Sequence, residues 1–207
     1  MNSTSIRAAV LILKHHGVSM CITGELALNY YNVPRVCHLD DDFNNYTEYK
    51  RGFPRVRTTR WTYPPQSIVI FPAPFFSLDP IETVLVPPSA DRKVHISKEI
   101  PDLSQEDIAN LPLPRLAPLL KGLARRFLDT GDDVAMIAVE QLVDGMNLDE
   151  AWAEKHLEGS DATLMTLVMN QIRSKKSRID YFSENKITCF ISDEEEAENV
   201  RLIPGLE

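Results

Sequence analysis

Near its amino terminus the chain reads Ile22-Thr23-Gly24-Glu25-Leu26-Ala27-Leu28, and this stretch decides the fold class. The apolar run at residues 18–22 predicts a short strand, Thr23-Gly24 a tight turn, and the Leu- and Ala-rich residues 25–31 a helix. Glycine lets a ligand approach the backbone, and a helix amino terminus offers unpaired N–H groups to a phosphate. Thr23 and Gly24 are therefore candidate phosphate-binding residues; the alternative is that they serve only the turn.

An acidic cluster follows this helix. Pro34 stops the helix because proline disfavours helical geometry in the residue before it, and residues 35–39 then run extended. The extended segment ends at Asp40-Asp41-Asp42, where Asp40 and Asp42 project on the same side of the backbone. Such a pair can chelate a hard cation such as Mg²⁺. The alternative is a solvated turn, for which aspartates beside asparagines are typical.

The rest of the chain divides into parts of different pattern, so the predicted fold class is α/β (α+β). Residues 1–112 form an α/β part, residues 113–192 a helical part packed on it, and residues 193–207 an acidic mobile tail. The proline-rich residues 72–118 predict irregular chain. The periodicity predicts helices at residues 6–14, 114–128, 132–144, 148–156 and 163–176, and a hairpin of strands near residues 55–57 and 67–70.

Composition limits the function classes. The formal charge of the 207 residues is −8 and the pI is near 5.2, which disfavours a surface built as a whole to bind nucleic acid. Three cysteines without metal-like spacing fit reduced thiols and a cytoplasmic location. No stretch is long and apolar enough to predict a transmembrane helix, and no membrane partner is expected.

Two segments together resemble a known family. Thr23-Gly24-Glu25-Leu26-Ala27-Leu28, then Val33-Pro34-Arg35-Val36-Cys37-His38 and the acidic cluster, resemble the opening of the abortive-infection type nucleotidyltransferases of the polymerase-beta superfamily. Leu113-Pro114-Arg115-Leu116-Ala117-Pro118-Leu119-Leu120-Lys121, continuing to Arg126, and Gly131-Asp132-Asp133-Val134-Ala135-Met136-Ile137 are similar to the helical region of the same family. The two matches occur in the family's order.

The resemblance implies a nucleotidyltransferase-like mixed β-sheet with flanking helices, followed by a carboxy-terminal helical region. It also implies two-metal nucleotidyl transfer from a nucleoside triphosphate to an unknown acceptor, a protein or an RNA, with Mg²⁺ as cofactor. Asp40 and Asp42 would be the catalytic and metal-binding residues. The nucleotide-binding residues would be Thr23, Gly24, Arg35 and Lys121.

The sequence departs from the family pattern at the acids. Asp40 and Asp42 lie in a run of aspartates rather than in an apolar strand, and residues 67–71, where the family supplies a third acid, contain no carboxylate. The alternative function is therefore a catalytically inactive nucleotidyltransferase-fold binding or assembly module.

Two further clusters are weaker candidates. Arginines and aromatic residues gather between residues 51 and 61, and Arg55 and Arg57 share a strand face, which suits a nucleic-acid or protein adaptor or simply an exposed hairpin. Lys121 is also a candidate to pair with Asp132 or Asp133 between helices. The histidines, including His156, are isolated, so no zinc site or hydrolase triad is predicted.

Overall fold

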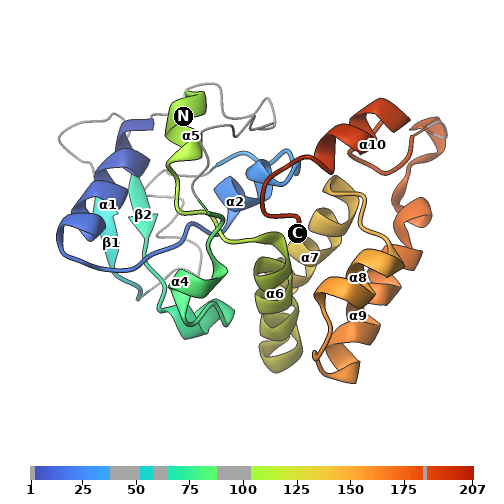
Figure 1. Ribbon diagram of the computed structural model, residues 1–207, viewed down its shortest axis with the longest axis horizontal. Coiled ribbons are helices and arrows are strands. Elements are labelled where there is room, and N and C mark those ends of the chain that lie inside the picture. Colours follow the sequence, from blue (N-terminus) through green and yellow to red (C-terminus); the bar gives the residue numbers. More distant parts are fainter. Residues whose placement is uncertain (1–2, 38–51, 58–64, 88–103, 184–185) are drawn as a thin grey trace.

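The part of the chain that the structure describes is α+β and mostly helical, with one small antiparallel sheet (Figure 1). The computed structural model describes residues 3–37, 52–57, 65–87, 104–183 and 186–207. Asp40 and Asp42 lie outside these ranges. The coarse prediction of a chain that mixes helices and strands is confirmed.

The amino-terminal region contains two helices. Helix α1, Ser3–His15, ends at Gly17, whose φ of 67° is the left-handed conformation that glycine adopts freely. Helix α2, Glu25–Tyr30, follows as predicted. The strand predicted at residues 18–22 is absent, and the amide of Ile22 instead donates one hydrogen bond to Pro112 O at 2.8 Å. Because Pro112 and Pro114 have no N–H to give back, the neighbouring segment cannot complete a ladder.

The sheet within the described residues is a two-stranded hairpin. Strand β1, Arg55–Arg57, pairs antiparallel with β2, Ser67–Val69, so that Arg55 lies opposite Val69 and Arg57 opposite Ser67. Helix α1 packs on β2. The hairpin prediction is confirmed, whereas the described residues do not show a mixed sheet.

The proline-rich region is more regular than predicted. It contains the 3-10 helix η2, Ala73–Phe76, and the short helices α4, Ile81–Val84, and α5, Gln105–Ala109. Prolines precede η2 and α4 because their fixed φ suits the start of a helix. Helices of four or five residues carry little periodic signal, which is why the prediction of irregular chain failed here.

The helical part confirms the four predicted helices with shifted ends. They are α6, Leu116–Thr130, α7, Asp133–Gly145, α8, Glu150–His156, and α9, Ala162–Arg173, followed by η3, Lys175–Arg178, and η4, Tyr181–Ser183. Aspartate side chains accept backbone N–H bonds at the starts of α7, α8 and α9. Helices α6, α7 and α9 pack against one another.

The carboxy-terminal residues pack on the core. Residues 193–207, expected to be an acidic mobile tail, contain helix α10, Glu194–Val200, and a segment at residues 201–207 that we call the terminal segment. Val200 is fully buried and Ile203 is 2% exposed, while the acidic residues Glu194 and Glu195 remain exposed. The charge run is thus the outer face of an amphipathic helix. Tyr30 donates from Oη to Pro204 O at 2.9 Å, which joins α2 to this segment.

Candidate functional site

The Thr23-Gly24 turn has the geometry of a helix start. Gly24 caps α2 with φ 69° and ψ −150°, and as a glycine it offers no side chain to the first amides of the helix. A Cβ added to Gly24 would meet nothing within 4 Å, so the glycine is required by its backbone conformation and not by close packing. Glu25 places a carboxylate in the first turn. The turn is thus explained by its backbone, and its open side leaves room for a ligand.

Arg35 is tied to the helical part. Asn29 on α2 holds its backbone, accepting from Arg35 N at 3.2 Å and donating to Arg35 O at 2.6 Å. The guanidinium of Arg35 donates from Nε to Gln141 Oε1 on α7 at 2.9 Å. Arg35 therefore bridges the segment after α2 and helix α7.

Lys121 lies in a different environment from the one predicted. It does not pair with Asp132, because that carboxylate accepts from Arg126 Nε at 3.0 Å and from the amide of Val134 at 3.1 Å. Asp132 is the amino-terminal cap of α7. Lys121 instead lines a cavity of about 420 Å³.

This cavity, which we call the cationic cavity, collects positive charge from two helices. The polar and charged side chains that line it are Ser77, Arg115, Lys121, Lys155, His156 and Glu207. Its wall includes the first turn of α6 and the last turn of α8. Burial lowers the pKa of His156, and the Lys155 charge lowers it further, so the imidazole is neutral at pH 7. Three cations and one carboxylate then leave a net charge of +2.

The two lysines in this cavity are unengaged. Neither Lys121 nor Lys155 forms a hydrogen bond or ion pair with any residue of the described ranges. Arg115 is partly engaged, since its Nη2 donates to Thr83 O at 2.5 Å, while its buried Nε has no partner among the described residues. His156 stacks on Trp152 with ring centroids 5.0 Å apart, which fixes the imidazole in the wall. The cavity thus offers cationic donors to a ligand.

Sequence reasoning identified Lys121 in this cavity but missed its neighbours. Ser77 follows η2, Arg115 precedes α6, Lys155 and His156 end α8, and Glu207 lies in the terminal segment. No spacing rule connects positions so far apart along the chain. The adjacency of Lys155 and His156 at a predicted helix end was a weak signal for a site. Basic residues near a helix carboxyl end commonly serve only to balance the helix dipole.

The acidic pair cannot be placed. Asp40 and Asp42 lie outside the described residues, and within those residues no three His, Cys, Asp or Glu side chains are grouped to hold a metal ion. The confirmed strands β1 and β2 contain no carboxylate. The metal-binding role of Asp40 and Asp42 therefore stays a prediction from the sequence.

The arginine-rich segment is described only over residues 52–57. Arg55 is half-buried and Arg57 exposed, so the two do not present one open basic face. Phe53 packs on Phe71 and Phe75 with ring centroids 4.6 and 5.1 Å apart. An aromatic ring engaged in this way is not available to stack on a base, which weakens the adaptor interpretation for Phe53.

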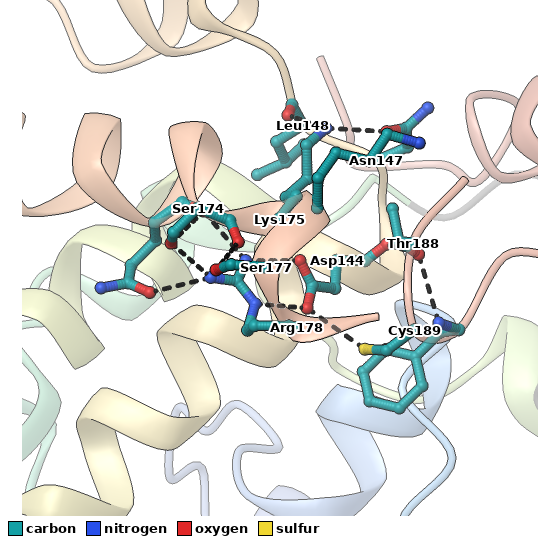
Figure 2. Close-up of polar contacts among 12 residues, drawn as sticks. Asp144, Asn147, Leu148, Ser174, Lys175, Ser177, Arg178, Thr188 and Cys189 are labelled. Carbon is teal, nitrogen blue, oxygen red and sulfur yellow. Dashed lines mark hydrogen bonds and ion pairs between the residues drawn. The ribbon is translucent and has the colours of Figure 1, made fainter. Parts of the chain in front are cut away.

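A second polar cluster surrounds Asp144, which is 1% exposed (Figure 2). Arg178 binds both carboxylate oxygens, from Nε at 2.7 Å and from Nη2 at 2.5 Å, and the Cys189 thiol donates to Oδ2 at 3.2 Å. Burial raises the pKa of Cys189 to about 12, and the hydrogen bond to Asp144 acts in the same direction. The thiol therefore stays protonated. This cluster holds residues 188–191 against α7 and is structural.

The other thiols are equally unreactive. All three cysteines are free, and burial raises the pKa of Cys21 to about 11 and that of Cys37 to about 12. None of them is a thiolate at neutral pH, so none is a candidate nucleophile.

No protein-family model, curated protein or solved structure matches this chain. The resemblance to nucleotidyltransferases therefore stays a prediction from the two sequence segments. No helix in the described ranges has the length and apolar character needed to cross a membrane.

Proposed function

We propose that this chain is a nucleotidyltransferase-like protein that binds a nucleoside triphosphate with Mg²⁺ and transfers its nucleotidyl group to an acceptor, a protein or an RNA. The finer part of the fold proposal is that β1 and β2 belong to a nucleotidyltransferase-like mixed sheet. One observation supports the proposal above the others: the chain in and beside the first family-like segment contacts the chain in and beside the second.

These contacts link residues in or beside the two segments and span 83 to 113 residues of sequence. Tyr31 donates from Oη to Pro114 O at 2.7 Å, and both groups are buried. Asn32 donates from Nδ2 to Gly145 O at 3.0 Å, and Arg35 reaches Gln141 on the same helix. A single functional site built from both segments requires such contact, because catalytic groups act only where the chain brings them together.

The proposed roles follow the resemblance. Thr23 and Gly24 would contact phosphate oxygens through the open side of the turn, and Lys121 would neutralise phosphate charge. Asp40 and Asp42 would hold Mg²⁺, which activates the acceptor hydroxyl and offsets charge on the triphosphate when bound. Arg35 would be the fourth nucleotide-binding residue, with its Nε held by Gln141.

A second candidate function is supported by the strands themselves. Ser67-Ile68-Val69 forms β2, where the family would supply a third acid, and it presents no carboxylate. A fold of this kind without its third acid can act as a catalytically inactive binding or assembly module. The two functions differ in one measurable property, which is turnover.

The test combines nucleotide binding with transfer. Mg²⁺ and a nucleoside triphosphate at about 100 times its Kd should stabilise the fold by about 2.7 kcal/mol and raise Tm by roughly 5–10 °C. With labelled triphosphate and a cell extract as acceptor source, label should enter a macromolecule, and Asp40→Asn or Asp42→Asn should abolish this transfer. Asp129→Asn, which removes an exposed aspartate of α6, is the control.

The outcomes separate the two functions. If the triphosphate binds but no label is transferred, even by the unaltered chain, the inactive module is favoured. The absence of any Tm shift with all four triphosphates at millimolar concentration would exclude both as nucleotide-binding functions.

A further inference from the structure

The cationic cavity has the volume of a small-ligand site and is partly open to solvent. Its volume of about 420 Å³ falls within the roughly 300–1,000 Å³ typical of ligand pockets. Its wall is contributed by α6, α8, the residue after η2 and the terminal segment, so the fold as a whole shapes it. A site of this kind is more rigid than one built on a single loop.

The net positive charge of the cavity lining favours a negatively charged ligand. Lys121 and Lys155 lack partners in the described part of the chain, and each lies close enough to His156 to lower its pKa. Cations gathered around one cavity give it a positive local potential on a chain with net charge −8, and this potential favours an anionic ligand. The local charge thus opposes the charge of the whole molecule.

The dipoles of two helices also affect the electrostatic potential in the cavity. The amino-terminal turn of α6 lines the cavity through Ala117 and Pro118, and its dipole adds positive potential to that of Lys121. The carboxyl end of α8 contributes the opposite partial charge, which Lys155 offsets. Glu207 is the one acid among the described lining residues, and it forms no ion pair there.

We propose that the cationic cavity is a polyphosphate-binding site, in which Lys121, Lys155 and Arg115 bind a chain of phosphate groups. Lysine ammonium groups and the arginine fork both suit phosphate oxygens, and two or more phosphates are needed to engage cations from two helices. The ligand is the triphosphate of a nucleotide or an inorganic polyphosphate. For the nucleotide, the inference rests on the proposed function through Lys121 alone, because neither Thr23 nor Gly24 lines the cavity.

The test uses isothermal titration of the full chain with inorganic tripolyphosphate. Binding is expected, and Lys121→Ala or Lys155→Ala should each weaken it about tenfold, which corresponds to loss of one charge-assisted hydrogen bond. Lys14→Ala, which removes the same charge from exposed α1, should leave the Kd unchanged. The altered side chains are exposed or half-buried, so each variant should fold. The Tm of each variant checks this.

Glu207 supplies a test of opposite sign. Glu207→Gln should tighten tripolyphosphate binding severalfold because the carboxylate repels the ligand, whereas Glu198→Gln on exposed α10 should not. No binding at millimolar tripolyphosphate would overturn the proposal. Equal weakening by Lys14→Ala and Lys155→Ala would also overturn it, because the effect would then be one of net charge.

The same variants distinguish this inference from the proposed function. If tripolyphosphate binds through the lysines but no nucleoside triphosphate binds with Mg²⁺, the cavity stands as an inorganic polyphosphate site and the proposed function fails. If a nucleoside triphosphate binds with Mg²⁺ equally well to Lys155→Ala and to the unaltered chain, the nucleotide has another site, and the assignment of its triphosphate to the cavity is overturned.

Discussion

Gly122 lies where α6 crosses the backbone of η2. A Cβ at this position would lie 1.9 Å from Phe76 O, a contact that no rotation of a side chain can relieve. The residue therefore sets how closely α6 approaches η2, and with it the position of Ser77 beside Lys121 in the cavity wall.

Gly122→Ala is expected to destabilise the fold. Alanine has a higher helix propensity than glycine by about 1 kcal/mol, so an isolated helix would gain stability. Here the helix must move away from Phe76, and such overpacking costs roughly 1–3 kcal/mol. Urea denaturation of the variant measures the difference, and an increase in the free energy of unfolding would show that the close approach is not required.

At the scale of elements, Asp144 and Arg178 join α7 to η3. Arg178→Ala would leave the buried carboxylate of Asp144, 1% exposed, without its cationic partner, which costs roughly 3–5 kcal/mol. Arg173→Ala breaks a pair with Glu150 whose side chains are 60% and 47% exposed, and it should cost less than about 1 kcal/mol. Chemical denaturation of both variants checks the contrast; equal losses would contradict the structural role of Asp144.

The elements also show what a sequence can predict. Helices α6 to α9 are predicted from their long apolar periodicity, and the structure adds the caps Asp132 and Asp161 at the starts of α7 and α9. The strand at residues 18–22 was predicted wrongly because a strand exists only through its partner, and residues 111–114 alternate with prolines. The cavity could not be predicted beyond Lys121, because Arg115, Lys155 and Glu207 converge only after the helices pack.

At the scale of the whole molecule, the terminal segment closes the fold. Its backbone accepts hydrogen bonds from Tyr30 Oη at Pro204, from the Leu116 amide at Gly205 and from Trp152 Nε1 at Leu206, at 2.9, 2.7 and 2.9 Å. These donors belong to α2, α6 and α8, so one short segment connects the amino-terminal and helical parts. Residues 193–207 are predicted as a mobile tail because the acidic run at residues 193–196 dominates the pattern, whereas the buried apolar residues such as Val200 and Ile203 are few.

Gly205→Ala should release this segment. Gly205 has φ 94°, and an added Cβ would lie 2.6 Å from both Tyr31 Oη and Val86 Cγ2. Loss of the three hydrogen bonds would cost about 2–4 kcal/mol and speed amide hydrogen exchange at Leu116. Gly159→Ala, at φ 76° with nothing within 4 Å, measures the cost of the backbone conformation alone, about 1 kcal/mol. Equal losses in the two variants would mean that the segment does not hold the parts together, because only Gly205 adds steric conflict to the shared strain.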